Sequence, residues 1–168
     1  MAPLEIERKF LIRQTEEMIS ACCEEISIVQ TYLERSDSDL QRRVRSWTKD
    51  GSTRYFYTEK RFISPSVREE NEREISLEEY ISLLSEADRE LRPIIKTRRL
   101  LSYKNQDFEI DSYPFSSELA TMELELSHES QEIIFPPFVE IIKEVTGNSA
   151  YSNANLALNG KFPDEDKP

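Results

Sequence analysis

Glu5-Ile6-Glu7-Arg8-Lys9-Phe10-Leu11, near the start of the chain, places charged residues at every second position. Alternate side chains of a β-strand lie on the same face, so the pattern predicts a strand that presents Glu5, Glu7 and Lys9 to one side. A strand that only packed into an ordinary core would have apolar residues there. Carboxylates two residues apart suit a hard cation such as Mg²⁺, and a lysine beside them suits phosphate.

Pairs of like charge recur on later strand candidates, and the two members of each pair share a face because they lie two residues apart. A solvent-facing sheet would explain any single pair. Solvent faces usually mix signs, however, because like-charged neighbours destabilise a sheet. We therefore expect the sheet to close with acidic and basic rows facing each other across its interior. The pairs are Glu109 with Asp111 and Glu123 with Glu125 on the acidic strands, and Arg43 with Arg45 and Lys96 with Arg98 on the basic strands.

The remaining patterns predict an α+β domain, built as a closed antiparallel eight-stranded β-barrel with a charged interior. Barrels of about eight strands are wide enough to hold one small ligand. Helices are expected to cover the apolar outer face. Strands are predicted at 4–11, 26–33, 40–47, 54–60, 67–75, 94–103, 108–113 and 121–127, and helices at 15–23, 76–87 and 149–158. Residues 138–145 fit either a strand or a short helix. We expect residues 1–160 to form one domain and residues 161–168 a frayed tail.

The composition of the chain argues against several classes of partner and binding motif. The chain has 168 residues and a net charge of −11, which argues against a nucleic-acid duplex as partner. No apolar run reaches membrane-spanning length, and the adjacent Cys22 and Cys23 indicate neither a disulfide framework nor a zinc site, so a cytoplasmic location is expected. With only 3 glycines, a P-loop or dinucleotide fingerprint is excluded, and any phosphate must be bound by side chains.

The ordered motifs resemble those of the CYTH superfamily, also called triphosphate tunnel metalloenzymes. The first stretch is similar to the family's ExExK signature, and the resemblance continues to about residue 158. The further motifs are Gln30-Thr31-Tyr32-Leu33, Arg43-Val44-Arg45, Thr58-Glu59-Lys60, Arg68 with Glu70 and Glu72, Lys96-Thr97-Arg98, Glu109-Ile110-Asp111, Glu123-Leu124-Glu125, Glu144-Val145-Thr146-Gly147 and the stretch at 151–156.

The resemblance implies a tunnel that binds a small-molecule triphosphate with Mg²⁺ or Mn²⁺. Lys96 is the implied group for placing or polarising the attacking water, and Lys9 and Arg98 are further catalytic candidates. Tyr32 is either a core aromatic or a residue beside the substrate. The resemblance also implies roles at the positions that match the family's motifs. The implied substrate-binding residues are Lys9, Arg43, Arg45, Lys60, Arg68, Lys96 and Arg98. The implied metal ligands are Glu5, Glu7, Asp111, Glu123 and Glu125, and Glu70, Glu72 and Glu109 are further implied tunnel-lining residues.

The leading interpretation is hydrolysis of tripolyphosphate or of an organic triphosphate such as thiamine triphosphate or a nucleotide. Two alternatives stay open at this point. One is an adenylate cyclase of the class that shares the tunnel, and the other is a polyphosphate-binding module without turnover. A homodimer is also compatible with the sequence, which does not fix the oligomeric state.

Overall fold

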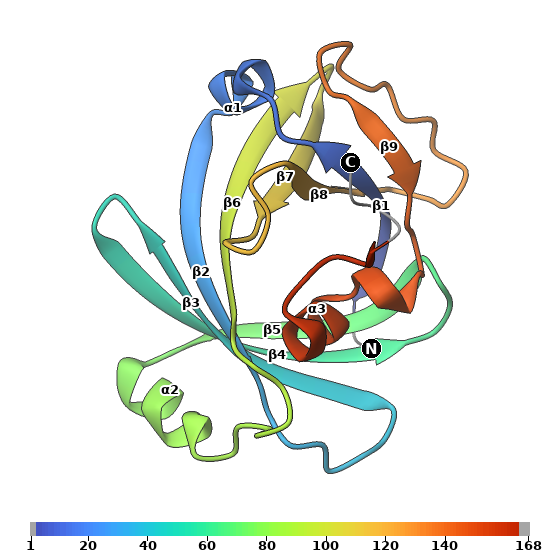
Figure 1. Cartoon of the computed structure of the whole chain (residues 1–168). Coiled ribbons are helices and arrows are strands. Elements are labelled where there is room, and N and C mark those ends of the chain that lie inside the picture. Colours follow the sequence, from blue (N-terminus) through green and yellow to red (C-terminus); the bar gives the residue numbers. More distant parts are fainter. Residues whose placement is uncertain (1–2, 165–168) are drawn as a thin grey trace.

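The computed structural model describes residues 3–164 and shows the strands wrapped around a central axis (Figure 1). Their order is β5-β4-β3-β2-β6-β7-β8-β1-β9, every pairing is antiparallel, and β5 also pairs with β1, which closes a barrel of eight strands. The predicted fold class is therefore confirmed, with β9 as an extra strand. The strands are β1 (Leu4–Arg13), β2 (Glu24–Tyr32), β3 (Leu40–Lys49), β4 (Ser52–Phe62), β5 (Val67–Ile75), β6 (Ile94–Tyr103), β7 (Gln106–Ser112), β8 (Leu119–Glu125) and β9 (Ile141–Glu144).

The register of the strands gathers the charged pairs inside the barrel. Lys9 of β1 lies opposite Glu123 of β8, and Arg98 of β6 lies opposite Asp111 of β7. Residues directly opposite each other in a ladder share a face of the sheet. Acidic pairs on β7, β8 and β1 form one arc of the wall, and basic residues on β6, β3 and β4 form the facing arc. The expected juxtaposition of acidic and basic rows is thus present.

Two covers protect the apolar outer face of the barrel. Helix α2 (Leu77–Leu84), capped by Ser76, lies over β3 and β4, where Tyr80 packs near Val44 and Ile75. Helix α1 (Glu16–Ala21), capped by Thr15, buries Met18 against β1, β6, β7 and β8.

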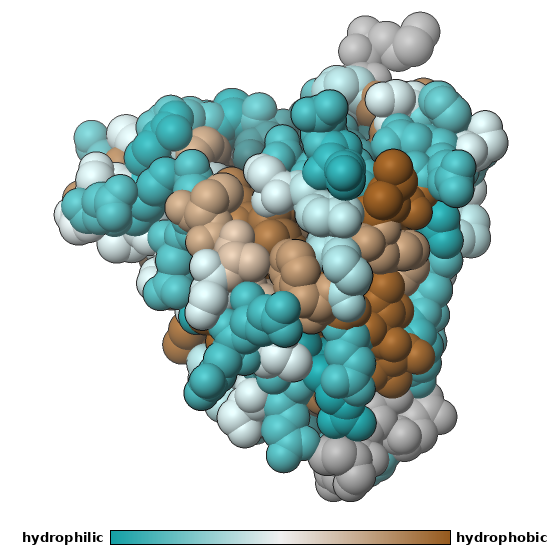
Figure 2. All heavy atoms as spheres, turned by 90° about the horizontal axis from the view of Figure 1, so that it is seen from above, coloured by the Kyte–Doolittle hydropathy of each residue, from teal (hydrophilic) through white to brown (hydrophobic). Residues whose placement is uncertain are grey.

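The segment at 126–140 packs on the same face as α1, so the helices expected to cover the outer face share this role with an irregular segment. Phe135 packs edge-on to Phe10 at 5.0 Å, and Val139 is buried in the same cluster. This segment contains Pro136 and Pro137 and shows no helix or strand period, so local patterning gave no signal for its packing. Figure 2 shows the face that carries α1 and β9, where an apolar area interrupts a mainly hydrophilic surface.

The C-terminal part of the chain closes one end of the barrel. The predicted helix at 149–158 is two pieces, the 3-10 helix η1 (Ser149–Tyr151) and α3 (Asn153–Asn159), with Ser152 capping α3. Tyr151 and Leu156 pack on the inward-facing Leu11 and Tyr113, and α3 crosses the barrel opening (Figure 1). The ambiguous region at 138–145 contains strand β9, which pairs with β1.

Phe162 is buried in the same cluster as Tyr151, two residues beyond the predicted domain boundary at residue 160. The boundary itself stays a prediction, and residues 165–168 of the expected tail lie outside the described residues. Within residues 3–164, every helix is too short or too polar to span a bilayer.

Candidate functional site

The barrel encloses a cavity of about 710 Å³ whose wall is mainly ionic. Cationic and acidic side chains from the two arcs meet around it, as the alternation on each strand requires. A cavity of this size matches a small-molecule site. The charged side chains that line it are Glu5, Glu7, Lys9, Arg35, Arg43, Arg45, Lys60, Arg68, Glu70, Glu72, Arg98, Glu109 and Glu123.

The inner face of β3 carries three buried N–H donors that lack an acceptor among the described residues. They are Nε of Arg43, Nε of Arg45 and Nε1 of Trp47. The three residues alternate along one strand and all line the cavity. Buried donors without acceptors are rare in native proteins and call for an explanation such as a bound ion. This row of donors therefore indicates an anion site.

Lys9 joins the wall of the barrel to the segment that closes it. Its Nζ lies 3.1 Å from a carboxylate oxygen of Glu123 and donates to the carbonyl oxygen of Tyr151 at 2.9 Å. Burial opposes the charge of Glu123, but the Lys9 ammonium, together with the charges of Arg98 and Lys96, lowers the Glu123 pKa to about 2. The ammonium thus lies on the cavity wall, close to the acidic arc.

Carboxylates crowd the β1 and β5 side of the cavity. Burial and a hydrogen bond with Glu70 raise the pKa of Glu5 to about 8. Burial likewise raises the Glu70 pKa in part, but the hydrogen bond with Glu5 and the charge of Lys60, 2.6 Å away, lower it to about 2. Burial and the charge of Glu123 raise the pKa of Glu7, even though Arg68 lies 2.7 Å from it. Glu5 and Glu7, unlike Glu70, therefore lack enough neighbouring positive charge to offset their burial.

A divalent cation fits this carboxylate-rich side of the cavity. Its donors are hard oxygen atoms, and the raised pKa values of Glu5 and Glu7 show carboxylates that another positive charge would stabilise. Across residues 3–164, no three acidic, His or Cys side chains converge on one metal position. That is compatible with Mg²⁺, which is commonly held by one or two carboxylates together with waters and substrate phosphates.

Lys96, Arg98 and Asp111 form a buried cluster in the β6 and β7 wall. Asp111 accepts from Lys96 Nζ at 2.7 Å and from Arg98 Nε and Nη2 at 2.8 and 2.9 Å. Burial opposes the Asp111 charge, but the two cations hold its pKa far below the usual range. Burial lowers the pKa of Lys96 to about 7. The remaining guanidinium nitrogen of Arg98, Nη1, lies 2.5 Å from a carboxylate oxygen of Glu109 at the cavity.

The structure brings most of the predicted site residues to one cavity. Lys96 and Asp111 do not line it and contact each other within the wall, and Glu125 is exposed at the end of β8. The roles predicted for these three residues stay predictions. The residues that line the cavity as predicted are Glu5, Glu7, Lys9, Tyr32, Arg43, Arg45, Lys60, Arg68, Glu70, Glu72, Arg98, Glu109 and Glu123.

Sequence reasoning missed part of the wall. Gln41 and Trp47 share the parity of Arg43 and Arg45, so the period of two along β3 could have found them. The residues at 145–149 and 152–155 also line the cavity. Parts of both stretches belong to the motifs at 144–147 and 151–156, but no alternation marks them as cavity lining, because they reach the cavity by crossing the end of the barrel.

Comparisons with known proteins agree with this architecture. A profile described as CYTH domain matches residues 3–156. The solved structure of the inorganic triphosphatase NE1496 is 29% identical over 97% of this chain and 98% of that chain, with a TM-score of 0.58. The PH1819 protein from Pyrococcus horikoshii OT3 is 19% identical over 74% of this chain and 80% of that chain, with a TM-score of 0.56.

A plant protein, HpAC1 from Hippeastrum, is 16% identical over 74% of this chain and 80% of that chain, with a TM-score of 0.52. It is described as an adenylyl cyclase candidate with a dominant triphosphatase activity. At such identities, the likeness to HpAC1 and to PH1819 shows the fold alone. A search of curated proteins found no match.

Proposed function

The chain belongs to the CYTH domain family, and we propose that it hydrolyses triphosphate compounds with the help of a divalent cation. The observation that carries the proposal is the row of unpartnered donors on β3, Arg43 Nε, Arg45 Nε and Trp47 Nε1, inside a cavity lined by both charge signs. An anion rich in oxygen acceptors would satisfy these donors. The 29% identity with a protein named an inorganic triphosphatase, over nearly the whole of both chains, supports the same activity.

Basic side chains on several strands give the cavity the means to bind three phosphoryl groups. Lys9 lies on the acidic arc, and Arg68 of β5 lies beside Glu7 of that arc. The facing arc carries Arg43, Arg45, Lys60 and Arg98. Guanidinium groups suit phosphate oxygens because they donate in a planar fork. When bound, Mg²⁺ or Mn²⁺ would neutralise phosphate charge, and Glu5, Glu7 and Glu123 are the residues that would hold it.

In the proposed reaction, the oxygen of a water molecule bonds to the terminal phosphorus, and the bond from that phosphorus to the bridging oxygen breaks. Orthophosphate and, from tripolyphosphate, diphosphate leave. Lys9 and Arg98 stabilise the negative charge on the transferred group because both line the cavity. Lys96 is held by Asp111 within the wall, so we assign it to the support of Arg98.

The experiment is a phosphate-release assay with tripolyphosphate, thiamine triphosphate and ATP, each with Mg²⁺ or Mn²⁺. We expect orthophosphate from at least one substrate, and loss of this activity when EDTA removes the cation. Formation of cyclic AMP from ATP without orthophosphate would instead establish a cyclase. Calorimetric binding of tripolyphosphate without any phosphate release over hours would establish a binding module. The cytoplasmic location and a homodimer also stay predictions.

A further inference from the structure

Arg45 is almost fully enclosed in the wall of the cavity, with only 5% of its side chain exposed. Two contacts hold its guanidinium group. Nη2 pairs with Oε2 of Glu72 on β5, and the guanidinium carbon lies 5.1 Å from the centre of the Trp47 ring. Nε has no acceptor within residues 3–164. The two contacts therefore fix the guanidinium and leave one donor for a ligand.

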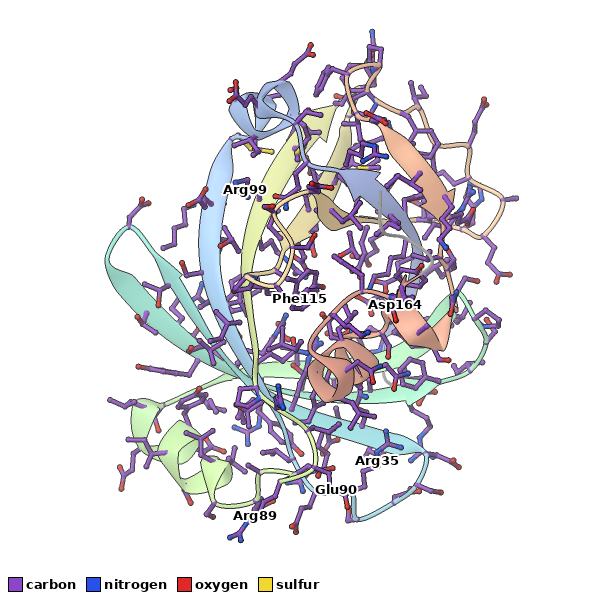
Figure 3. All side chains as sticks on the ribbon, viewed as in Figure 1. Arg35, Arg89, Glu90, Arg99, Phe115 and Asp164 are labelled. Carbon is purple, nitrogen blue, oxygen red and sulfur yellow. The ribbon has the colours of Figure 1, made fainter. Side chains whose placement is uncertain are left out.

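Several other arginine–carboxylate pairs of this protein engage Nε. Arg54 donates from Nε and Nη2 to Glu74 at 3.0 and 2.5 Å. Arg99, which Figure 3 labels beside β2 and β6, donates from Nε to a carboxylate of β2 at 3.0 Å. A planar fork of this kind is favoured because two parallel N–H donors match the two carboxylate oxygens. At Arg45 the carboxylate takes Nη2 and not Nε, so a further contact must hold that carboxylate in place.

Thr58 supplies the contact that holds Glu72. Its Oγ1 donates to Glu72 Oε2 at 2.7 Å, and the same oxygen accepts from Arg45. The two residues lie opposite each other on β4 and β5, and Thr58 is completely buried. A β-branched side chain has few χ1 rotamers, so the hydroxyl group keeps a fixed position in the wall. Because this hydroxyl is uncharged, it secures the carboxylate without a further positive charge that would draw it away from Arg45.

Glu72 differs from the preceding carboxylate on the same face of β5. Glu70 lies 2.6 Å from Lys60 and 3.7 Å from Arg43, so two cations share it. Among the described residues, Arg45 is the one cation that forms an ion pair with Glu72. A negative charge inside an anion site weakens binding by repulsion. Its presence beside Arg45 is explained if the orientation that it gives the guanidinium outweighs the repulsion.

We propose that Thr58 and Glu72 are positioning residues, which hold the Arg45 guanidinium so that its Nε donates to the anion in the cavity. Both residues act through Arg45 and not on the reacting atoms. The proposal rests on the proposed function, since it assumes that the anion is the triphosphate substrate. It deepens that function by naming the residues that control how tightly the donors on β3 bind. Removing the Glu72 charge should therefore weaken, and not strengthen, the binding of a polyanion.

The first test compares KM and kcat for the preferred triphosphate in the parent protein, Glu72→Gln and Glu74→Gln. Loss of a repulsive charge alone would lower KM. Loss of the positioning contact should raise KM by about tenfold with kcat within about twofold of the parent, because Arg45 binds the ground state and the transition state alike. Glu74 is the matched control, because it lies on the same face of β5 and pairs with Arg54 but does not line the cavity. Its variant should keep the parent KM.

The second test removes the hydroxyl of Thr58. Thr58→Val, which replaces the hydroxyl by a methyl group, should raise KM by about fivefold, and Thr58→Ser, which keeps the hydroxyl, should restore the parent value. In an Arg45→Ala background, Thr58→Val should have no further effect on KM, since both residues act through one guanidinium. Glu72→Gln should lower KM in that background, because only its repulsion of the anion remains. Melting temperatures show which variants fold, and the Glu72→Gln pair decides alone if Thr58→Val does not.

Two results would overturn the positioning role while leaving the triphosphatase intact. They are an unchanged or lower KM in Glu72→Gln of the parent protein, and an equal effect of Thr58→Val with and without Arg45. If the parent releases no phosphate from any triphosphate, the proposed function fails. The Kd of tripolyphosphate with Mg²⁺, measured by calorimetry in the same variants, then decides on the positioning role with the same expected directions. Absence of tripolyphosphate binding to the parent would overturn both.

Discussion

The role of a charged residue in this protein depends on the residues that it contacts. Lys9 lies between Glu123 and the carbonyl of Tyr151, on the surface of the cavity. Asp111 carries the same formal charge as Glu123 but is enclosed by Lys96 and Arg98. Charge alone therefore does not separate a residue that meets the ligand from one that stabilises the wall.

Replacing Lys9 tests a residue that meets the ligand. We expect Lys9→Ala to reduce turnover of the preferred triphosphate by about a hundredfold or more, as loss of one transition-state contact often does. The measurement is kcat in the phosphate-release assay, together with the melting temperature. Lys104→Ala, on the exposed turn before β7, is the matched lysine control. Activity within a few-fold of the parent would remove Lys9 from the phosphate site.

Replacing Asp111 tests a residue within the wall. Asp111→Asn leaves two buried cations without their carboxylate, so we expect unfolding in urea to show a loss of about 3 to 5 kcal/mol. Asp107→Asn changes an exposed carboxylate of the same strand and should cost about 0.5 kcal/mol or less. Unchanged stability with a raised cation requirement would instead show that Asp111 is a metal ligand.

At the scale of elements, the segment from β9 to α3 has two structural roles. It adds β9 to the sheet beside β1 and then closes one end of the barrel, with Tyr151 and Leu156 against Leu11. Gly147 is the point at which it turns toward the loop between β4 and β5. The attachment of this segment therefore affects both the stability of the barrel and the shape of the cavity.

One attachment is sensitive to pH. Arg8 holds Glu144 of β9 with hydrogen bonds of 3.1 and 2.5 Å, and the bond to Arg8 lowers the Glu144 pKa. A lowered folded-state pKa stabilises the fold above the unfolded pKa of 4.5, and this gain is lost as the pH falls through the folded value. Because the pair is largely solvated, we expect Glu144→Gln to cost at most about 1 kcal/mol at pH 7.

Urea unfolding of the parent and of Glu144→Gln at pH 7 and at pH 3 measures this effect. The difference between the two proteins should shrink at pH 3, where the parent carboxyl is increasingly protonated. A difference that grows on acidification would contradict the assignment.

Close packing at Gly147 attaches the same segment to the barrel. Gly147 has a φ of +69°, and a Cβ there would lie 2.4 Å from Cβ of Pro65. Gly51 has a φ of +77° with nothing within 4 Å, so Gly51→Ala measures the cost of the backbone conformation alone. We expect Gly147→Ala to lower the free energy of unfolding by about 1–3 kcal/mol more than Gly51→Ala, because of overpacking. Equal losses of unfolding free energy in the two variants would show that the loop around Pro65 moves to accommodate the added methyl group without cost.

At the scale of the whole molecule, the net charge of −11 and the basic side chains inside the cavity have opposite effects on an anionic ligand. The overall charge repels a polyphosphate at long range, so binding depends on the local field of the barrel interior. Folding gathers this field from strands that are far apart in the chain. A ligand that binds only the folded protein must then stabilise it.

Thermal unfolding measures this linkage. With Mg²⁺, tripolyphosphate at about 100 times its Kd should stabilise the protein by about 2.7 kcal/mol, which is about 5–10 °C in Tm for a chain of this size. Sulfate at equal ionic strength is the control and should give a much smaller shift. An equal shift with sulfate would indicate a general salt effect and would count against a specific polyphosphate site.

The patterns along the chain were enough to predict the strands and an antiparallel barrel, and the alternation of charges predicted part of the cavity lining; the family resemblance added others, such as Arg68, Glu70 and Glu72. Glu5, Glu7 and Lys9 share a face because side chains of a strand alternate, and this local rule needs no tertiary information. The same rule applies to Arg43 and Arg45 on β3, and to Glu109 and Glu123 on neighbouring strands. All of these residues line the cavity.

Only the tertiary structure decided which charged side chains pair with each other and which other residues surround them. It paired Asp111 with Lys96 and Arg98 inside the wall and brought Tyr151 to Lys9 across 142 positions. The physical reason is that periodicity reports the face on which a side chain lies. The partner it meets there depends on strand register and on segments without periodicity, such as 126–140 and the residues that lead into α3.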